Sequence, residues 1–450
     1  MYKIGDYIFD SERLLVYNNG IHHNTLNAVI DAMCEKENAM PELLRHDPDK
    51  MHADKVTTNL AGICLTYNCN LRCNYCGYSS ANSDDNKLQI SDVEAFIKDI
   101  IKKRAIRKYL FKEEIPLDIY FTGGGEPTFD WKLFEKSVLL IERMCAERTI
   151  PLRLGLTTNG MLSDNHINFI VQHFDNVMVS YDGLPEVQNR NRRTPESNDT
   201  NVFVEHTIQQ FAKADIFLTV RSTIWKNDYH KIEKMYDYIS SIIQDWHNVT
   251  WSVHPTMYEG RALDQICMED DKSYKDFLRY YVNLIEKIIA KEGYTSIKNV
   301  DMSIFYDTEC DVFCSAHSVS RPWLLPDGSI VTCIESKEYK TYIGKIKEGT
   351  LKYYDEYSDE LLKMTQKKYS ECQECIAYPF CKGGCPIWHL RVQNDLEIPE
   401  CSLQKEFWRY VIEAALVGKY SFGWRLEKIN VTHTETDGIY KLVHKPSETP

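Results

Sequence analysis

The chain has 450 residues, of which 43% are hydrophobic, 26% are charged and 15 are cysteines. Its formal net charge of −13 argues against nucleic acid or anionic lipid as the main partner, because phosphate groups would be repelled. No run approaches the roughly 18 apolar residues of a membrane span, and the N-terminus lacks the basic and then apolar stretch of a signal peptide. We therefore expect a soluble, cytoplasmic protein with no membrane contact.

The first 57 residues are interpreted as a separate segment, with a short strand pair followed by a helix from about Thr25 to Leu44. This segment could bind a peptide by adding it as a strand, or it could cap the edge of the next domain. Both roles stay open.

Between residues 58 and 260, strand-like apolar runs alternate with amphipathic helices, one of which is expected to open with a capping box at Ser91 and Glu94. The six runs end near Tyr67, Thr122, Thr158, Asp182, Ser222 and Pro255. Six alternations imply a parallel sheet with right-handed crossovers but fall short of a closed eightfold barrel. The predicted class is α/β, a partial (β/α)6 TIM barrel with its chemistry at the carboxyl ends of the strands.

The remaining chain divides into three parts. A helical linker is expected at 261–304, a cysteine-rich domain at 305–402, and a helix with a hairpin tail at 403–450. Fifteen cysteines are a poor disulfide framework in a compartment that keeps thiols reduced, so metal or iron–sulfur ligation is the better interpretation.

Three cysteines follow the first predicted strand in the sequence CNLRCNYC, at Cys69, Cys73 and Cys76. Three thiolates on one short loop can wrap around a 4Fe–4S cluster and leave one iron open. A zinc loop is the alternative. The spacing, with an aromatic residue before the third cysteine, resembles the radical S-adenosylmethionine (radical SAM) superfamily. That resemblance implies that SAM chelates the fourth iron and is cleaved reductively to a 5′-deoxyadenosyl radical.

Further motifs at the later strand ends support the resemblance. The sequence FTGGGEP, from Phe121 to Pro127, resembles the motif that holds the amino group of SAM, where glycines permit close backbone approach. The segments TTNG, SYDG and LTVRST end the next strands. The resemblance implies SAM contacts at Tyr75, Gly124, Gly125, Glu126, Asn159, Ser180, Arg192 and Arg221. Simple loop packing for Tyr75, and surface ion pairs for the two arginines, are the competing interpretations.

A second group of cysteines resembles the SPASM extension of radical SAM peptide and protein modifiers. By this resemblance two auxiliary 4Fe–4S clusters would be held, giving three clusters in total. The nearer would use Cys310, Cys314, Cys333 and Cys385, and the farther Cys372, Cys375, Cys381 and Cys401. Cys310 lies outside the seven-cysteine pattern, and without it the nearer cluster would have an open iron. A pair of zinc knuckles is the alternative.

The resemblance implies a maturase that crosslinks side chains of a ribosomally made peptide, with a flavodoxin or ferredoxin as reductant. Sulfatase-type maturases, which make formylglycine, carry an aspartate directly after the cysteine matching Cys333, whereas this chain has Ile334 and then Glu335. Glu335, Glu259 and His254 are candidate catalytic bases, although a histidine at a strand end is more often structural. A small-molecule SPASM oxidoreductase and a non-catalytic iron–sulfur or zinc scaffold stay open as interpretations.

Overall fold

The structure is a computed structural model, and it describes the chain in separate stretches. These are residues 2–4, 7–10, 15–18, 58–80, 88–112, 115–214, 216–256, 261, 271–292, 300–301, 321–336, 342–354, 372, 375–385, 387, 400–417, 424–428 and 439–444. Two compact units are present. The first comprises residues 1–48, 305–313 and 363–450, and the second comprises 49–304 and 314–362. The predicted domain boundaries do not coincide with these units, and they stay an interpretation.

The second unit is built on a curved sheet whose central six strands are parallel, each pairing with the next along the chain. They are β4 (Leu60–Ile63), β5 (Leu117–Phe121), β6 (Leu152–Thr158), β7 (Asn176–Ser180), β8 (Phe217–Ile224) and β9 (Val249–Pro255). A short strand β10 (Val300–Asp301) adds to β9 in parallel. The predicted parallel α/β sheet is therefore confirmed. The last five strands end within two residues of their predicted ends, whereas β4 ends at Ile63, four residues before the predicted Tyr67.

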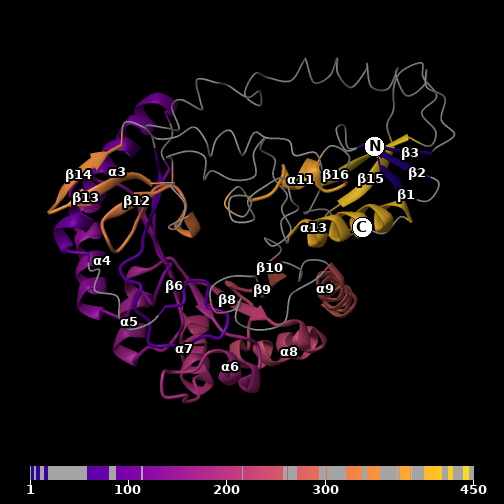
Figure 1. The fold of residues 1–450 in the computed structure, drawn as a ribbon, viewed down its shortest axis with the longest axis horizontal. Coiled ribbons are helices and arrows are strands. Elements are labelled where there is room, and N and C mark those ends of the chain that lie inside the picture. Colours follow the sequence, from indigo (N-terminus) through magenta and orange to yellow (C-terminus); the bar gives the residue numbers. More distant parts are fainter. Residues whose placement is uncertain are drawn as a thin grey trace. The chain divides into compact units, whose positions relative to one another are not determined.

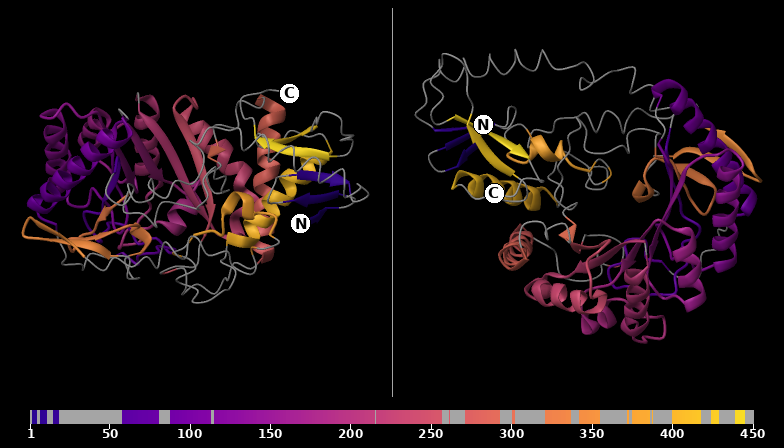
Figure 2. Two further views of the ribbon diagram at one scale, coloured as in Figure 1. Left: turned by 90° about the horizontal axis from the view of Figure 1, so that it is seen from above. Right: turned by 180° about the vertical axis from the view of Figure 1, so that it is seen from behind.

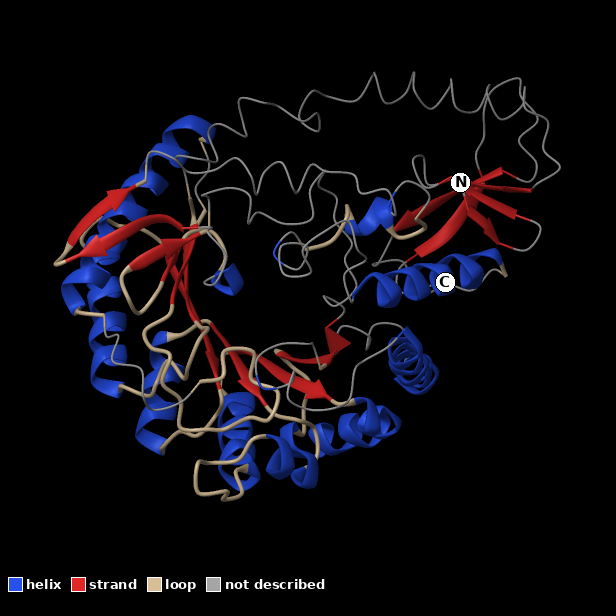
Figure 3. Cartoon of the chain, in the orientation of Figure 1, coloured by secondary structure: helices blue, strands red, loops and turns tan. Residues whose placement is uncertain are grey.

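Helices cover the outer side of this sheet (Figures 1 and 3). They are α3 (Ile90–Phe111), α4 (Trp131–Ala146), α5 (Asp164–His173), α6 (Pro185–Asn191), α7 (Asn201–Lys213), the 3-10 turn η2 (Lys226–Lys231), α8 (Ile232–Ile243) and α9 (Asp271–Glu292). In α8 the apolar face of Ile232, Met235, Tyr236, Ile239 and Ile243 is buried, and its residues recur with the period of a helix.

The expected capping box of α3 was wrong by two residues. The helix begins at Ile90, and the backbone N–H of Gln89 donates to Asp92 Oδ2 at 3.0 Å. Asp92 is held there from a distant part of the chain, because the Gly349 N–H donates to its other carboxylate oxygen at 3.1 Å. Glu94 instead forms an exposed ion pair with Lys98.

A four-stranded extension joins the sheet at β4, the first barrel strand. Its strands are β11 (Trp323–Leu324), β12 (Ser329–Val331), β13 (Tyr342–Lys347) and β14 (Thr350–Tyr353). β11 pairs with β4 in parallel, and the other three follow as antiparallel hairpins. Both views in Figure 2 show the outer hairpin beside α3. The segment before and after Cys333 is therefore part of the barrel sheet.

The first unit contains a five-stranded antiparallel sheet made from both ends of the chain. Its order is β1 (Tyr2–Ile4), β2 (Tyr7–Asp10), β3 (Leu15–Asn18), β16 (Ile439–His444) and β15 (Trp424–Lys428). The unit also holds α11 (Tyr378–Cys381) and α13 (Glu400–Leu416), whose Phe380 and Trp408 rings stack with centroids 3.4 Å apart. The segment predicted as a C-terminal helix and hairpin contains α13 and the antiparallel pair β15–β16, whereas the predicted helix at 25–44 lies outside the described residues. None of the helices described has the length and apolar character needed to cross a membrane.

The contact between Gly62 and Trp323 provides a test of how the extension is attached. A Cβ at Gly62 would overlap the Trp323 ring, so we expect Gly62→Ala to lower the free energy of unfolding by about 1–3 kcal/mol. Removing the ring in Trp323→Ala should cancel most of that cost, which urea unfolding of the two single variants and the double variant will measure. An equal cost of Gly62→Ala in both backgrounds would contradict the packing account.

Candidate active site

The three cysteines of the first motif lie in an irregular loop after β4, and nitrogen donors from other segments are directed at their sulfur atoms. Asn159 Nδ2 lies 3.8 Å from Cys69 Sγ, and Arg192 Nη1 lies 4.0 Å from Cys73 Sγ. Burial raises the pKa of the Cys69 thiol to about 12 and that of Cys73 to about 11. Thiolates at these positions therefore need nearby positive charge, such as bound iron would supply.

The donor chemistry of this loop fits a 4Fe–4S cluster, which takes one thiolate at each iron and accepts hydrogen bonds at its sulfur atoms. Among the described residues, no three His, Cys, Asp or Glu side chains are placed to ligate a single metal ion. Cys69, Cys73 and Cys76 would hold three corners of the cluster, leaving the fourth iron for another ligand.

The glycine motif after β5 lies against the chain that leads into the cysteine loop. The Gly125 N–H donates to Thr66 O at 3.0 Å, and a Cβ on Gly125 would overlap the backbone of Asn68. Gly124 has φ of +57°, and a Cβ there would press on Tyr67. Both glycines are thus required by the close approach of the chain before the cysteine loop, and their predicted contact with SAM stays a prediction.

Glu126 is 3% exposed, and its carboxylate joins the end of β5 to the end of β6. Oε1 accepts hydrogen bonds from Thr128 Oγ1 at 2.7 Å and Thr158 Oγ1 at 2.9 Å, and Oε2 accepts one from the Asn159 N–H at 2.7 Å. Asn159 in turn donates to Asn70 Oδ1 at 2.6 Å. In this structure Glu126 therefore positions Asn159 beside the cysteine loop.

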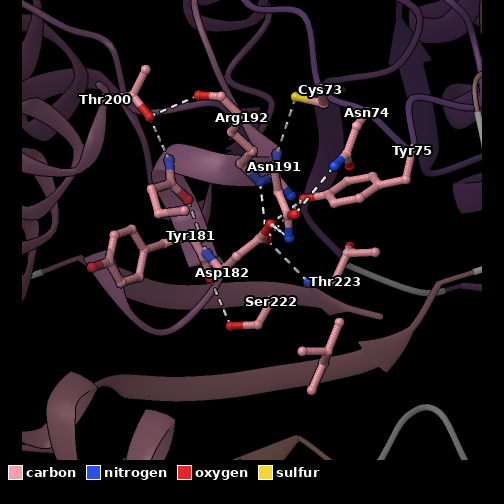
Figure 4. A network of polar contacts seen from close by, with 12 residues as sticks. Cys73, Asn74, Tyr75, Tyr181, Asp182, Asn191, Arg192, Thr200, Ser222 and Thr223 are labelled. Atoms are coloured by element: carbon pink, nitrogen blue, oxygen red, sulfur yellow. Dashed lines mark hydrogen bonds and ion pairs between the residues drawn. The ribbon is translucent and has the colours of Figure 1, made fainter. Parts of the chain in front are cut away.

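Tyr75 and Arg192, both predicted SAM contacts, meet at a residue that the sequence analysis did not single out. Asp182 is fully buried after β7 and accepts hydrogen bonds from the Tyr75 hydroxyl at 2.6 and 2.8 Å and from Arg192 Nε at 3.0 Å (Figure 4). The guanidinium carbon of Arg192 lies 5.2 Å from the centre of the Tyr75 ring. Burial is the largest single influence on Arg192 and acts to lower its pKa, but Asp182, with smaller contributions from Tyr75 and Cys73, together outweighs it and raises that pKa.

The remaining candidate residues of the barrel lie on three adjacent strands. Ser180 at the end of β7 is opposite Arg221 on β8. On β9, His254 Nε2 lies 2.9 Å from Ser252 Oγ. Burial, and then the charge of Arg221, hold the pKa of His254 well below its usual range, so the ring is neutral at pH 7. The third candidate base, Glu259, lies outside the described residues.

Arg261 fastens the end of the cysteine loop. Its Nη1 donates to Cys73 O at 2.6 Å, its Nη2 donates to Ser80 O, and its backbone N–H donates to Cys76 O at 3.1 Å. No local sequence pattern indicates that the partners of Arg261 lie in a loop at the other end of the barrel sequence.

The hairpin that bears Cys333 brings Glu335 to the cysteine loop. Glu335 Oε1 accepts a hydrogen bond from the Tyr78 hydroxyl at 3.1 Å. The Ile334 side chain occupies the space beside Gly123, where a Cβ would overlap it. Burial, and then the nearby Glu335 carboxylate, raise the pKa of Tyr78 well above its usual range. Glu335 was predicted from the sequence, whereas no pattern in the sequence indicated Tyr78.

Five cysteines of the second group are described within the first unit. They are Cys372, Cys375, Cys381, Cys385 and Cys401. The Cys375 N–H donates to Cys372 O at 3.3 Å, and the Gly384 N–H donates to Cys381 O at 2.8 Å. Burial, with smaller contributions from Cys375 and Cys372, raises the pKa of Cys381 to about 12. Cys310 and Cys314 lie outside the described residues, and the ligand assignment stays a prediction.

The buried, neutral His254 predicts a specific dependence of stability on pH. Its folded-state pKa is below the unfolded value of about 6.5, so as the pH falls through 6.5 the unfolded chain gains a proton that the folded chain does not. The free energy of unfolding should then decrease by up to about 1.4 kcal/mol per pH unit, and His254→Gln should remove this component. Urea titrations between pH 5.5 and 7.5 measure it; identical pH profiles for both proteins would contradict the assignment.

The comparisons with known proteins agree with one another. The radical SAM superfamily model matches residues 63–239. A cysteine-type anaerobic sulfatase-maturating enzyme of Clostridium perfringens is 24% identical over 368 residues, which cover 76% of this chain and 93% of the relative. A serine-type enzyme of Klebsiella aerogenes is 23% identical over 336 residues, covering 73% of this chain and 79% of the relative.

Two solved structures share the fold. Native anSMEcpe with bound AdoMet aligns with a TM-score of 0.61 at 20% identity, covering 79% of this chain and 97% of that chain. Streptococcus suis SuiB bound to precursor peptide SuiA aligns with a TM-score of 0.56 at 14% identity, covering 88% and 98%. The family implies SAM and a 4Fe–4S cluster as cofactors. The chain carries a radical SAM domain over residues 63–239 and is an enzyme homologous to anaerobic sulfatase-maturating enzymes.

Proposed function

We propose that this enzyme is a maturase that oxidises side chains of a ribosomally made peptide by removing two hydrogens, forming a crosslink. Two comparisons support a peptide or protein substrate. The curated relatives are named as sulfatase-maturating enzymes, and one structural neighbour holds a precursor peptide. A flavodoxin or ferredoxin would deliver the electron that starts the reaction.

The observation that carries the proposal is the hydrogen bond between Tyr78 and Glu335. Tyr78 follows Cys76 by two residues, and Glu335 follows Cys333 by two residues. A proposed ligand of the SAM cluster, a proposed ligand of an auxiliary cluster and a carboxylate are thus on neighbouring segments of one compact unit. Removal of two hydrogens requires a radical source, an electron acceptor and a base that lie close together.

In the proposed reaction, SAM and its cluster, held by Cys69, Cys73 and Cys76, would supply the radical that takes one hydrogen atom from the substrate. The second hydrogen leaves as a proton and an electron. Glu335 would accept the proton, because its exposed carboxylate is held by the Tyr78 hydroxyl, and the auxiliary clusters would accept the electron. The predicted assignment of eight cysteines to two auxiliary clusters is part of this proposal.

Formylglycine formation on a sulfatase is the second candidate, and the named activity of the 24% identical relatives favours it. The sequence differs from that of sulfatase maturases at one position that bears on this activity. Ile334 stands where sulfatase maturases carry aspartate, and its side chain packs on Gly123. In this chain the carboxylate belongs to Glu335, one residue after the position of that aspartate. For this reason we rank crosslinking first.

The proposal is tested by anaerobic co-expression with each short open reading frame beside the gene, followed by mass spectrometry of every peptide. We expect loss of two hydrogens, or multiples, and a crosslink mapped to side chains. Cys73→Ala should abolish SAM cleavage and the modification, whereas Cys145→Ala, at a buried thiol of α4, should retain both. A hydrazine-reactive aldehyde in a sulfatase-derived peptide, with unchanged short peptides, would instead establish the second candidate.

The role of Glu335 has a separate test. Glu335→Gln keeps an acceptor for the Tyr78 hydroxyl but cannot take up a proton, so product formation should fall by about 10²–10⁴-fold while 5′-deoxyadenosine is still produced. The matched variant Tyr78→Phe keeps the carboxylate and loses only the hydrogen bond, so its loss should be smaller. Full product formation by Glu335→Gln would exclude Glu335 as the base.

A further inference from the structure

Asp182 is a buried carboxylate that connects several segments of the site. It is fully buried, and its two oxygens accept hydrogen bonds from segments far apart in sequence. The Tyr75 hydroxyl lies at 2.6 and 2.8 Å, Asn191 Nδ2 at 3.0 Å, Arg192 Nε at 3.0 Å and the Thr223 N–H at 3.3 Å. These donors come from the cysteine loop, the end of α6 and the β8 strand (Figure 4).

Stability alone is a weak explanation for this arrangement. A buried ion pair often stabilises a protein no more than apolar residues of the same shape would, because both charges lose their hydration. What the pair does provide is orientation, since a carboxylate whose lone pairs are all used fixes the direction of each donor. The role of Asp182 therefore depends on the groups that it orients.

The two principal donors bring Asp182 into contact with the cysteine loop, because Tyr75 belongs to that loop and Arg192 reaches its Cys73. Arg192 is oriented by Asp182 through Nε and points Nη1 at Cys73 Sγ, 4.0 Å away. The Tyr75 ring lies under the same guanidinium. Beside them, Asn74 donates from its backbone to Asn191 O at 2.9 Å and from its side chain to Asn191 Oδ1 at 3.2 Å.

We propose that Asp182 is a positioning residue of the SAM cluster: by holding Arg192 beside Cys73 and the Tyr75 ring beside the Arg192 guanidinium, it sets the surroundings of the cluster and the affinity of its fourth iron for SAM. Partners of this kind, one bond removed from a metal ligand, orient the ligand and tune the metal. The inference rests on the SAM site of the proposed function and is independent of the substrate.

The chain offers a control in Asp228, which is also buried and also pairs with an arginine, Arg190 of α6. Its carboxylate contacts Arg190 and, at 3.0 Å, Lys231, neither of which lies in the cysteine loop. Asp182→Asn and Asp228→Asn thus each remove the charge of a buried aspartate that pairs with an arginine, although Arg190 is 44% exposed and Arg192 only 9%. A loss of stability common to both variants is the effect of removing a buried charge. A loss of SAM affinity that occurs only in Asp182→Asn is an effect on the cluster.

The experiment uses the full-length, cluster-loaded enzyme, reduced with dithionite under anaerobic conditions. SAM affinity and the change that SAM produces in the EPR spectrum are measured for wild type and both variants. Asp182→Asn should bind SAM about tenfold or more weakly, with an altered SAM-dependent spectrum, whereas Asp228→Asn should match wild type. Tyr75→Phe, which keeps the Asp182–Arg192 pair, should fall between them.

Each other outcome is decisive. A wild-type spectrum and affinity in Asp182→Asn, or equal changes in both aspartate variants, would overturn the positioning role while leaving the proposed function intact. If Asp182→Asn does not retain the cluster, Arg192→Lys decides: it keeps the charge but loses the planar fork, and a wild-type response would refute the proposal. Absence of any SAM response in wild type would overturn the proposed function and this inference together.

Discussion

An irregular loop can hold reactive thiols in one place only if its backbone polar groups are bound elsewhere, because buried and unpaired amides are costly. The loop from Cys69 to Ser80 meets this constraint through partners outside it. Its amides donate to the end of α6 and the residues after it, at Asn191 O and Arg193 O, and its carbonyls accept from Arg261. The cysteines are consequently placed by these distant segments as well as by the hydrogen bonds within the loop.

The charges around this loop follow from the same constraint. Glu126 and Asp182 are both buried, and each uses its carboxylate oxygens to connect one strand end to the next. In such surroundings an electrostatic interaction is stronger than in water, so side chains fixed in this way can influence a bound ion more than exposed charges would. The parallel sheet is what makes this arrangement possible, since it brings several carboxyl ends to one edge.

Features that depend on neighbouring residues were predicted well from the sequence. The six parallel strands follow from alternating apolar periods, and the cysteine loop and glycine motif follow from spacing. The pairing of strands that lie far apart in the sequence could not be predicted in the same way. Nothing near Trp323 indicates that it pairs with Gly62, and nothing in the two chain ends indicates that they share a sheet. Asp182 lay inside the SYDG motif, but its partners are fixed only by the fold.

The central claim is that three cysteines of one loop hold a cluster whose remaining iron is left for SAM. The most direct measurement is ENDOR spectroscopy of the reduced enzyme with SAM labelled by ¹⁵N in its amino group. We predict a hyperfine coupling between the label and the cluster in wild type and none in Cys73→Ala. A reduced cluster that binds SAM without any coupling in wild type would contradict the account.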